Sequence, residues 1–338
     1  MSENRRNEAE KEMQQDIDEV MRKYDRESNV RIWEGKPRIV VNLILGLFAL
    51  WSIYVTIFAT FLEEIRLTSF MGMIVFLGFL LYPAKKGKQK VNHMPVYDVI
   101  LMVVTSAAFF YFTFFANEIV NQGTRFAWYQ IVIGIIGIIG LVEVTRRCVG
   151  LPILFVAGFF VLYALTYGLT NPDFFLKVRY FIRNLFYTKE GIFSTPLNVC
   201  SKYIVVFIIF GAFLERIGIS AFFIELANCI AGRFAGGPAK VAVISSALCG
   251  MVSGSSVGNT VTTGSVTIPM MKKTGYSPEF AGAVEAASST GGQIMPPIMG
   301  AAAFLMADFV GVPYANIASR AILPAILYFA GIFICVHL

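Results

Sequence analysis

The residues best suited to bind a small solute lie in one stretch, residues 239–272, which is apolar enough for a membrane yet rich in small polar residues. Its centre reads ALCGMVSGSSVGNTVTTGSVTIPMM. Basic residues flank both ends, and a segment with two positive ends and a Gly-rich centre is typical of a hairpin that enters and leaves from the cytoplasm. The turn is predicted at residues 253–259. Its hydroxyl and amide oxygens come from Ser253, Ser255, Ser256, Asn259 and Thr263.

The next segment, residues 278–309, predicts a discontinuous helix. An apolar helix over residues 280–290 should end at a break and resume over residues 298–309. Proline removes a backbone donor and clashes with the preceding helical turn, so a proline pair after a glycine pair should unwind the helix near the middle of the membrane. The break contains Gly291, Gly292, Gln293, Ile294, Met295, Pro296 and Pro297.

Two irregular segments so close in sequence predict a binding site. Irregular backbone at membrane depth is tolerated only where it is buried in protein or faces water and ligand. Half-helix N-termini suit an anion, and unwound carbonyls suit a cation such as sodium. We therefore expect the hairpin turn to face the break, with Ser255, Asn259 and Gly292 in a sodium site. This chemistry fits a secondary transporter that binds a cation together with an anionic solute.

Glu285, in the first half of the broken helix, is the candidate for coupling to a proton or to substrate. Carboxylates inside a membrane cost about 2.5–3.5 kcal/mol on insertion scales and are often functional. The alternative for Glu285 is a pair with Lys or Arg at a helix contact. Glu143, one turn before Arg146 and Arg147, is more simply an interfacial ion pair.

Two other interpretations of the Gly- and Ser-rich stretch remain. Small residues can simply allow close helix packing, although packing requires neither Asn259 nor the proline break. The sequence GSSVG also matches the G-x-S-x-G motif of serine hydrolases, which is a weak signal on its own. The only histidines, His93 and His337, lack a partner acid in the context that such an enzyme needs. We therefore predict that the protein is not an enzyme.

The composition indicates that helices in a membrane position these residues. Of 338 residues, 56% are hydrophobic and 15% charged, against about 25% charged in soluble domains. Apolar runs of about 20 residues are each long enough to span a bilayer. The fold class is therefore all-α, a polytopic helical membrane protein with a re-entrant hairpin and a discontinuous helix. The runs cover residues 39–62, 67–82, 97–115, 126–144, 151–169, 197–214 and 317–338, with a polar-interrupted helix over 219–234.

The charge pattern predicts the topology. Residues 1–38 are predicted to form a charged cytoplasmic segment, either with an amphipathic helix over residues 13–24 or as a solvated tail. The basic loop at residues 85–90 should also be cytoplasmic. Residues 171–196, outside on this count, are too basic for the rule and suggest a helix in the membrane interface. No basic stripe with aromatic residues indicates nucleic acid. The five cysteines show no metal-site spacing, so no cofactor is expected beyond a coupling ion.

At two stretches the sequence resembles the large permease subunit of TRAP transporters, the tripartite ATP-independent periplasmic family. They are GGPAKVAVISSALCGMVSGSSVGNTVTTGSVTIPMMKKTGY and FAGAVEAASSTGGQIMPPIMGAAAFLMA. GRFAGGPAK together with STGGQIMPPIMGAAAF is similar to the fused permeases that work with TAXI-type binding proteins. On this resemblance, residues 39–145 correspond to a small four-helix domain and residues 146–338 to the first half of a large domain.

The resemblance implies a permease in a bacterial inner membrane, with a cytoplasmic N-terminus. A periplasmic TAXI-type binding protein would deliver a small organic acid, and an elevator-type domain would carry it with sodium ions. It further implies that Ser255, Ser256 and Asn259 lie at the first hairpin tip, and Gly291, Gly292, Pro296 and Pro297 in the broken helix. The family's second inverted half is not found in these 338 residues. A non-transporting, truncated scaffold is therefore the alternative expectation.

Overall fold

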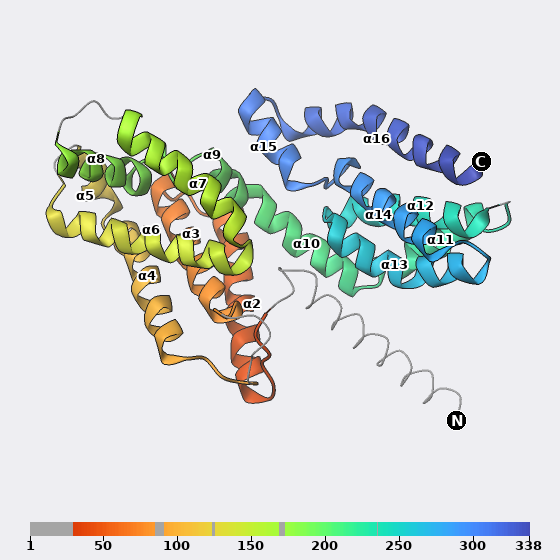
Figure 1. Ribbon diagram of the computed structural model, residues 1–338, viewed down its shortest axis with the longest axis horizontal. Helices are drawn as coiled ribbons and strands as arrows, with labels where there is room; N and C mark the ends of the chain where they lie inside the picture. Colours follow the sequence, from red (N-terminus) through yellow and green to blue (C-terminus); the bar gives the residue numbers. More distant parts are fainter. Residues whose placement is uncertain (1–29, 85–90, 124–125, 169–172, 235) are drawn as a thin grey trace. The chain divides into compact units, whose positions relative to one another are not determined.

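The computed structural model describes residues 30–84, 91–123, 126–168, 173–234 and 236–338, and the elements within these ranges are helices without any strand. The all-α fold class is thereby confirmed. The chain divides into two compact units, which meet in sequence between Ser201 and Lys202 (Figure 1). The predicted helix over residues 13–24 and the basic loop at residues 85–90 lie outside the described residues.

Six helices in the described part are long and apolar enough to cross a membrane. Each of these spans overlaps an apolar run of the sequence, at residues 39–62, 67–82, 97–115, 126–144, 197–214 and 317–338. The run at residues 151–169 instead forms the shorter α7 (Leu151–Tyr163) and the π-helix η1 (Ala164–Gly168). The six spans are Lys36–Ile57, Glu63–Leu81, Val96–Phe114, Trp128–Cys148, Thr195–Arg216 and Tyr314–His337.

The first unit has its core between α3, α4 and α6, with the fully buried side chains of Phe79, Phe109 and Phe186. Phe186 comes from α8, the helix predicted for the membrane interface. Its buried face packs against α6, where Gly137 leaves room for the Phe186 ring. The helices are α2 (Lys36–Ile57), α3 (Glu63–Leu81), α4 (Val96–Phe114), α5 (Ala116–Asn121), α6 (Trp128–Cys148), α7, η1, α8 (Phe174–Tyr187) and α9 (Thr195–Val199). The boundary between the units falls within the π-helix η2 (Cys200–Ile204).

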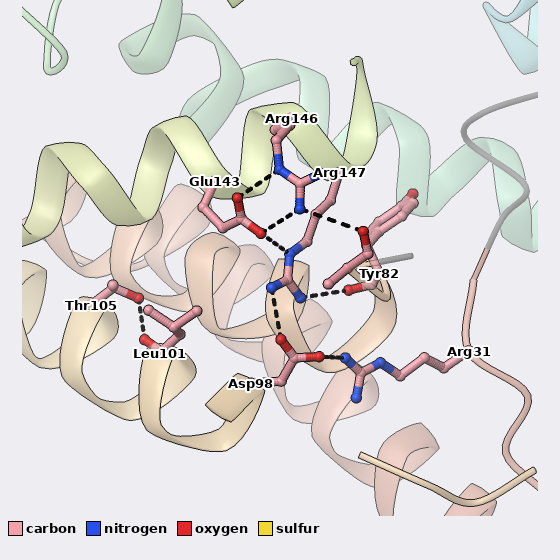
Figure 2. Close-up of polar contacts among 9 residues, drawn as sticks. Arg31, Tyr82, Asp98, Leu101, Thr105, Glu143, Arg146 and Arg147 are labelled. Carbon is pink, nitrogen blue, oxygen red and sulfur yellow. Dashed lines mark hydrogen bonds and ion pairs between the residues drawn. The ribbon is translucent and has the colours of Figure 1, made fainter. Parts of the chain in front are cut away.

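A buried ionic network in this unit links α4 and α6 to the segments before α2 and after α3 (Figure 2). Asp98 in α4 is fully buried and accepts hydrogen bonds from Arg31, ahead of α2, and from Arg147 at the end of α6, the latter at 2.7 Å. Arg147 also donates to Glu143 at 2.8 Å and to the Tyr82 carbonyl oxygen, just after α3, at 3.1 Å. The predicted pairing of Glu143 with Arg146 and Arg147 is therefore present. Arg147 is buried within the protein, whereas Glu143 and Arg146 are partly exposed.

The second unit is built on the packed helices α12, α13 and α14, with α16 against α12 and α14 (Figure 1). Lys240, near the start of α12, lies 3.0 Å from the His337 ring nitrogen Nδ1 at the end of α16. The helices are α10 (Val205–Arg216), α11 (Ile219–Ala231), α12 (Gly237–Ser253), α13 (Ser256–Lys273), α14 (Pro278–Gly291), η3 (Gly292–Ile294), α15 (Ala301–Val310) and α16 (Tyr314–His337).

Candidate functional site

The hairpin predicted over residues 239–272 is formed by α12 and α13, and its turn is tighter than expected. Only Gly254 and Ser255 lie between the two helices. Gly254 adopts a φ of 62°, which glycine tolerates without strain. The Ser255 hydroxyl oxygen then accepts a hydrogen bond from the Gly258 N–H at 3.2 Å and caps α13. Because of this cap, Asn259 lies inside α13 and not in the turn.

The predicted break in the helix is present after Gly291. The backbone tightens to a 3₁₀ turn at Gly292–Ile294 and becomes extended at Met295. Residues 295–300 are not helical, and the helix resumes at Ala301, three residues later than the predicted residue 298. Gly300 N–H closes this irregular segment by donating to the Gln293 carbonyl oxygen at 2.7 Å. Pro296 lies in the segment, half-buried.

The hairpin and the break meet, as the sequence predicted. Gly250 of α12 packs against Gly292 so closely that a Cβ atom added to Gly292 would lie 2.7 Å from the Gly250 Cα atom. Gln293 Nε2 donates to the Ser256 hydroxyl oxygen at 3.1 Å, and Ile298 N–H donates to the Met251 carbonyl oxygen at 3.3 Å. The irregular backbone therefore has polar partners within the protein, which it could not obtain from lipid.

Asn259 lies beside this contact with one polar atom left over. Its side chain is 1% exposed, and its Nδ2 donates to the Ser246 carbonyl oxygen at 2.8 Å. A Cβ atom on Gly292 would lie 3.3 Å from that Nδ2, so the carboxamide borders the break. Its Oδ1 has no hydrogen-bond partner among the described residues. An unpaired buried acceptor costs about 1–3 kcal/mol, so a cation or a water molecule would stabilise it.

The space near Asn259 is large enough only for a very small ligand, such as a water molecule or an ion. A cavity of about 10 Å³ is bordered by Asn259, Ser253 and Thr262, and such a volume holds about one water molecule. Among the described residues, no group of three or more His, Cys, Asp or Glu side chains could hold a metal ion. The oxygens that border it include those of the Asn259 amide, the Ser253 and Thr262 hydroxyls and the Glu215 carboxylate, to which Thr262 donates at 2.8 Å. Hard cations bind oxygen ligands of these kinds.

Glu285 is fully buried in α14, and its described partners are hydroxyl groups and not the Lys or Arg of the alternative interpretation. Four hydroxyl groups surround its carboxylate. Ser246 lies 2.7 Å from Oε1 and Ser289 lies 3.0 Å from Oε1, while Thr267 lies 2.5 Å from Oε2. The fourth is Thr263, which thus joins Glu285 and not the hairpin turn. The hydroxyls come from both hairpin helices and from α14, so the cluster links the hairpin to the first half of the broken helix.

Most of the predicted site residues are therefore brought together, in two layers. In the outer layer, Ser256, Gly292 and Gln293 make the contact between the two helices of the hairpin and the break. Ser253 and Ser255 lie at the turn, and Gly291 and Pro296 lie at the break, where Gly291 faces the Tyr328 and Phe329 rings. The inner layer is Glu285 with Thr263, and Asn259 connects the two because its amide bonds the Ser246 carbonyl while the Ser246 hydroxyl bonds Glu285. Whether these residues bind an ion or a substrate stays a prediction. Sequence reasoning missed Ser246, Thr267 and Ser289, which look like ordinary polar residues in apolar helices.

Comparison with known families identifies the protein class. The family model described as "Tripartite ATP-independent periplasmic transporter, DctM component" matches residues 135–338, more than half of the chain. The chain belongs to this DctM family of TRAP transporter large permeases. Members are permeases and not enzymes, so the serine hydrolase interpretation of GSSVG is wrong. In this TRAP permease chain the serine at the nucleophile position of that motif, Ser256, accepts a hydrogen bond from Gln293 Nε2 of the helix break.

Individual relatives support the same family. The chain is 39% identical over 113 residues to "Uncharacterized protein y4mL" of Sinorhizobium fredii, a match covering 33% of this chain and 26% of that protein. Two further relatives are named "C4-dicarboxylate TRAP transporter large permease protein DctM". The one from Pseudomonas aeruginosa is 32% identical over a match that covers 40% of this chain and 29% of the relative. The one from Vibrio cholerae is 36% identical over a match that covers 27% of this chain and 20% of the relative. The matches thus span less than a third of each relative's length. No solved structure matches the chain.

Proposed function

We propose that the chain is the membrane permease component of a secondary-active TRAP importer in a bacterial inner membrane. It would move a small organic acid with a cation, and a periplasmic binding protein of the TAXI type would deliver the acid. The observation that carries the proposal is the contact between the hairpin turn and the helix break, with the unpartnered Asn259 Oδ1 beside it. The names of the relatives from Pseudomonas and Vibrio, which specify C4-dicarboxylates, support a carboxylate substrate.

The proposed topology follows the positive charge. The N-terminus, the basic loop at residues 85–90 and the hairpin ends at Lys240 and Lys272 would face the cytoplasm. The fold is compatible with this because Tyr276, after α13, lies against Gly236, before α12, so the hairpin begins and ends at the same level. The turn would then point toward the middle of the membrane, where transporters hold their substrates.

Uptake into vesicles tests the function. The permease is reconstituted with a TAXI-type binding protein and a labelled organic acid, under an imposed sodium gradient or an imposed proton gradient. Uptake that requires both the binding protein and one of the gradients supports the proposal. Absence of uptake of any acid by a folded protein favours the non-transporting scaffold alternative. Uptake that is independent of either gradient contradicts secondary-active transport.

Asn259→Ala is expected to weaken sodium dependence more than folding. The variant removes the unpartnered Oδ1, which we assign to the sodium ion together with Ser255 and Gly292. A loss of about 1.4 kcal/mol would raise the apparent sodium dissociation constant tenfold. The measurement is uptake against sodium concentration. Thr260→Ala is the matched control, because Thr260 is on the same helix and its hydroxyl bonds only the Ser256 carbonyl oxygen among the described residues. Equal sodium curves for both variants would contradict the assignment.

Glu285→Gln is expected to remove the response of uptake to a proton gradient. Glutamine keeps one carbonyl oxygen for Ser246 and Ser289, and its Nε2 can donate to the Thr267 hydroxyl, so the cluster stays hydrogen-bonded. The variant can no longer bind and release a proton. We therefore expect proton-driven uptake to fall at least about tenfold, with the sodium curve retained. A variant with unaltered pH dependence would show that Glu285 is a structural residue only.

A further inference from the structure

The first unit contains a cavity of about 220 Å³ that the transport site does not use. It lies between the first turns of α3, the end of α4, α5, α8 and the segment after α8. Its apolar wall includes four largely buried aromatic rings. Because it borders the start of one membrane span and the end of another, it lies at the level where a bilayer's hydrocarbon meets its headgroups. The rings belong to Phe112, Phe126, Tyr187 and Phe193.

Arg183 of α8 supplies the cavity with a positive charge. Its guanidinium carbon lies 5.7 Å from the centre of the Phe126 ring and 6.0 Å from that of Tyr180. Its Nε atom is buried and has no hydrogen-bond partner among the described residues. Arginine stays charged in proteins, and a buried donor without an acceptor is costly. The Arg183 guanidinium therefore lies against two aromatic rings, and its Nε–H is available for a hydrogen bond to a ligand.

The other charges that border the cavity are already balanced. Lys189 Nζ lies 2.8 Å from a Glu63 oxygen and 3.0 Å from a Glu64 oxygen. These two carboxylates raise the pKa of Lys189 above its ordinary value, so the ammonium group stays protonated. Glu64 and Lys189 thus satisfy each other, and Arg183 is the charged residue in the wall with an unused donor.

We propose that this cavity binds an anionic phospholipid, with the headgroup phosphate on Arg183 and the adjoining apolar part against the aromatic rings. A phosphate oxygen would accept the hydrogen bond from Arg183 Nε and compensate the guanidinium charge. The four rings would cover the beginning of an acyl chain, which gains from removal of apolar surface from water. The inference does not depend on the transport cycle, since its residues all lie in the first unit.

The test is lipid binding to the purified permease in zwitterionic nanodiscs, titrated with phosphatidylglycerol. We expect phosphatidylglycerol to raise the thermal midpoint of the wild type and to remain bound in native mass spectrometry. Arg183→Gln should lower the apparent lipid affinity about tenfold, which corresponds to about 1.4 kcal/mol. Lys177→Gln is the matched control, because it removes one positive charge from α8 outside the cavity wall. It should keep the wild-type affinity.

A second variant tests the cavity independently of Arg183, in case Arg183→Gln does not fold. Val120→Phe keeps Arg183 and fills the cavity from its α5 wall, where Val120 is half exposed. It should also lose phosphatidylglycerol binding. Equal affinity of the wild type for phosphatidylglycerol and phosphatidylcholine, or unchanged binding in both variants, would overturn the proposal. Equal stabilisation by inorganic phosphate alone would also overturn it, because the site would then recognise a free anion and not a lipid.

Discussion

Asp98→Asn is expected to destabilise the first unit by about 3–5 kcal/mol, the cost typical of removing one partner from a buried ion pair. Asp98 is fully buried and bonds both Arg31 and Arg147, which are themselves at most 7% exposed. Asparagine would deprive both guanidinium groups of the Asp98 carboxylate. Its amide oxygen could accept from one of them, and its NH2 group would then face the N–H donors of the other. Arg147 would keep Glu143 and the Tyr82 carbonyl oxygen, but Arg31 has Nε and Nη1 atoms that already lack partners among the described residues.

The measurement is the thermal midpoint of the purified permease in detergent. A loss of this size should lower the midpoint by about 10 °C in a unit of about 200 residues. Glu143→Gln is the graded control, since the Glu143 side chain is 23% exposed and its partner Arg146 is 38% exposed. Its second partner, the buried Arg147, would keep Asp98 and the Tyr82 carbonyl oxygen in this variant. More exposed pairs contribute about 0–1 kcal/mol. Equal midpoints for the two variants would show that burial does not set the strength of this network.

The contrast between Glu143 and Asp98 shows how far local sequence patterns reach. Glu143 precedes Arg146 and Arg147 by one helical turn, so its ion pairs follow from helix geometry. The partners of Asp98 are 67 and 49 residues away in sequence. No periodicity connects them, and only the packing of α4 and α6 with the segment before α2 brings them together. The same limit hid the partners of Glu285, three of which come from the hairpin helices.

The transport elements were more predictable because their signals are local. The polar centre of an apolar segment and the proline pair after two glycines each break a helix through the chemistry of adjacent residues. The helical position of Asn259 was not predictable in the same way. It depends on Ser255 being the N-cap of α13, and the sequence offers several neighbouring serines that could cap a helix. The apolar face of α8 was visible as an amphipathic pattern, but the pattern could not distinguish a lipid surface from the protein core that buries Phe186.

Gly292→Ala is expected to abolish transport while leaving most helices folded. The added methyl group would lie 2.7 Å from the Gly250 Cα atom and 3.3 Å from Asn259 Nδ2. Because the nearer neighbour is helix backbone and not the end of a flexible side chain, the hairpin and the break must move apart. Overpacking of this kind costs about 1–3 kcal/mol. A displacement of about 1 Å in a site can reduce its activity about a hundredfold, so we expect uptake to fall by at least that factor.

Gly282→Ala is the matched control for this substitution. Gly282 lies in the same broken helix, in α14, and a Cβ atom there would meet no heavy atom within 4 Å. Alanine should therefore stabilise the helix by about 0.4–1 kcal/mol and leave uptake unchanged. Both variants are compared by uptake per amount of folded protein, with the thermal midpoint measured alongside. If Gly292→Ala transports as well as Gly282→Ala, then the close contact between Gly250 and Gly292 is not needed in the working permease. The proposed sodium site beside Asn259 would lose its structural basis.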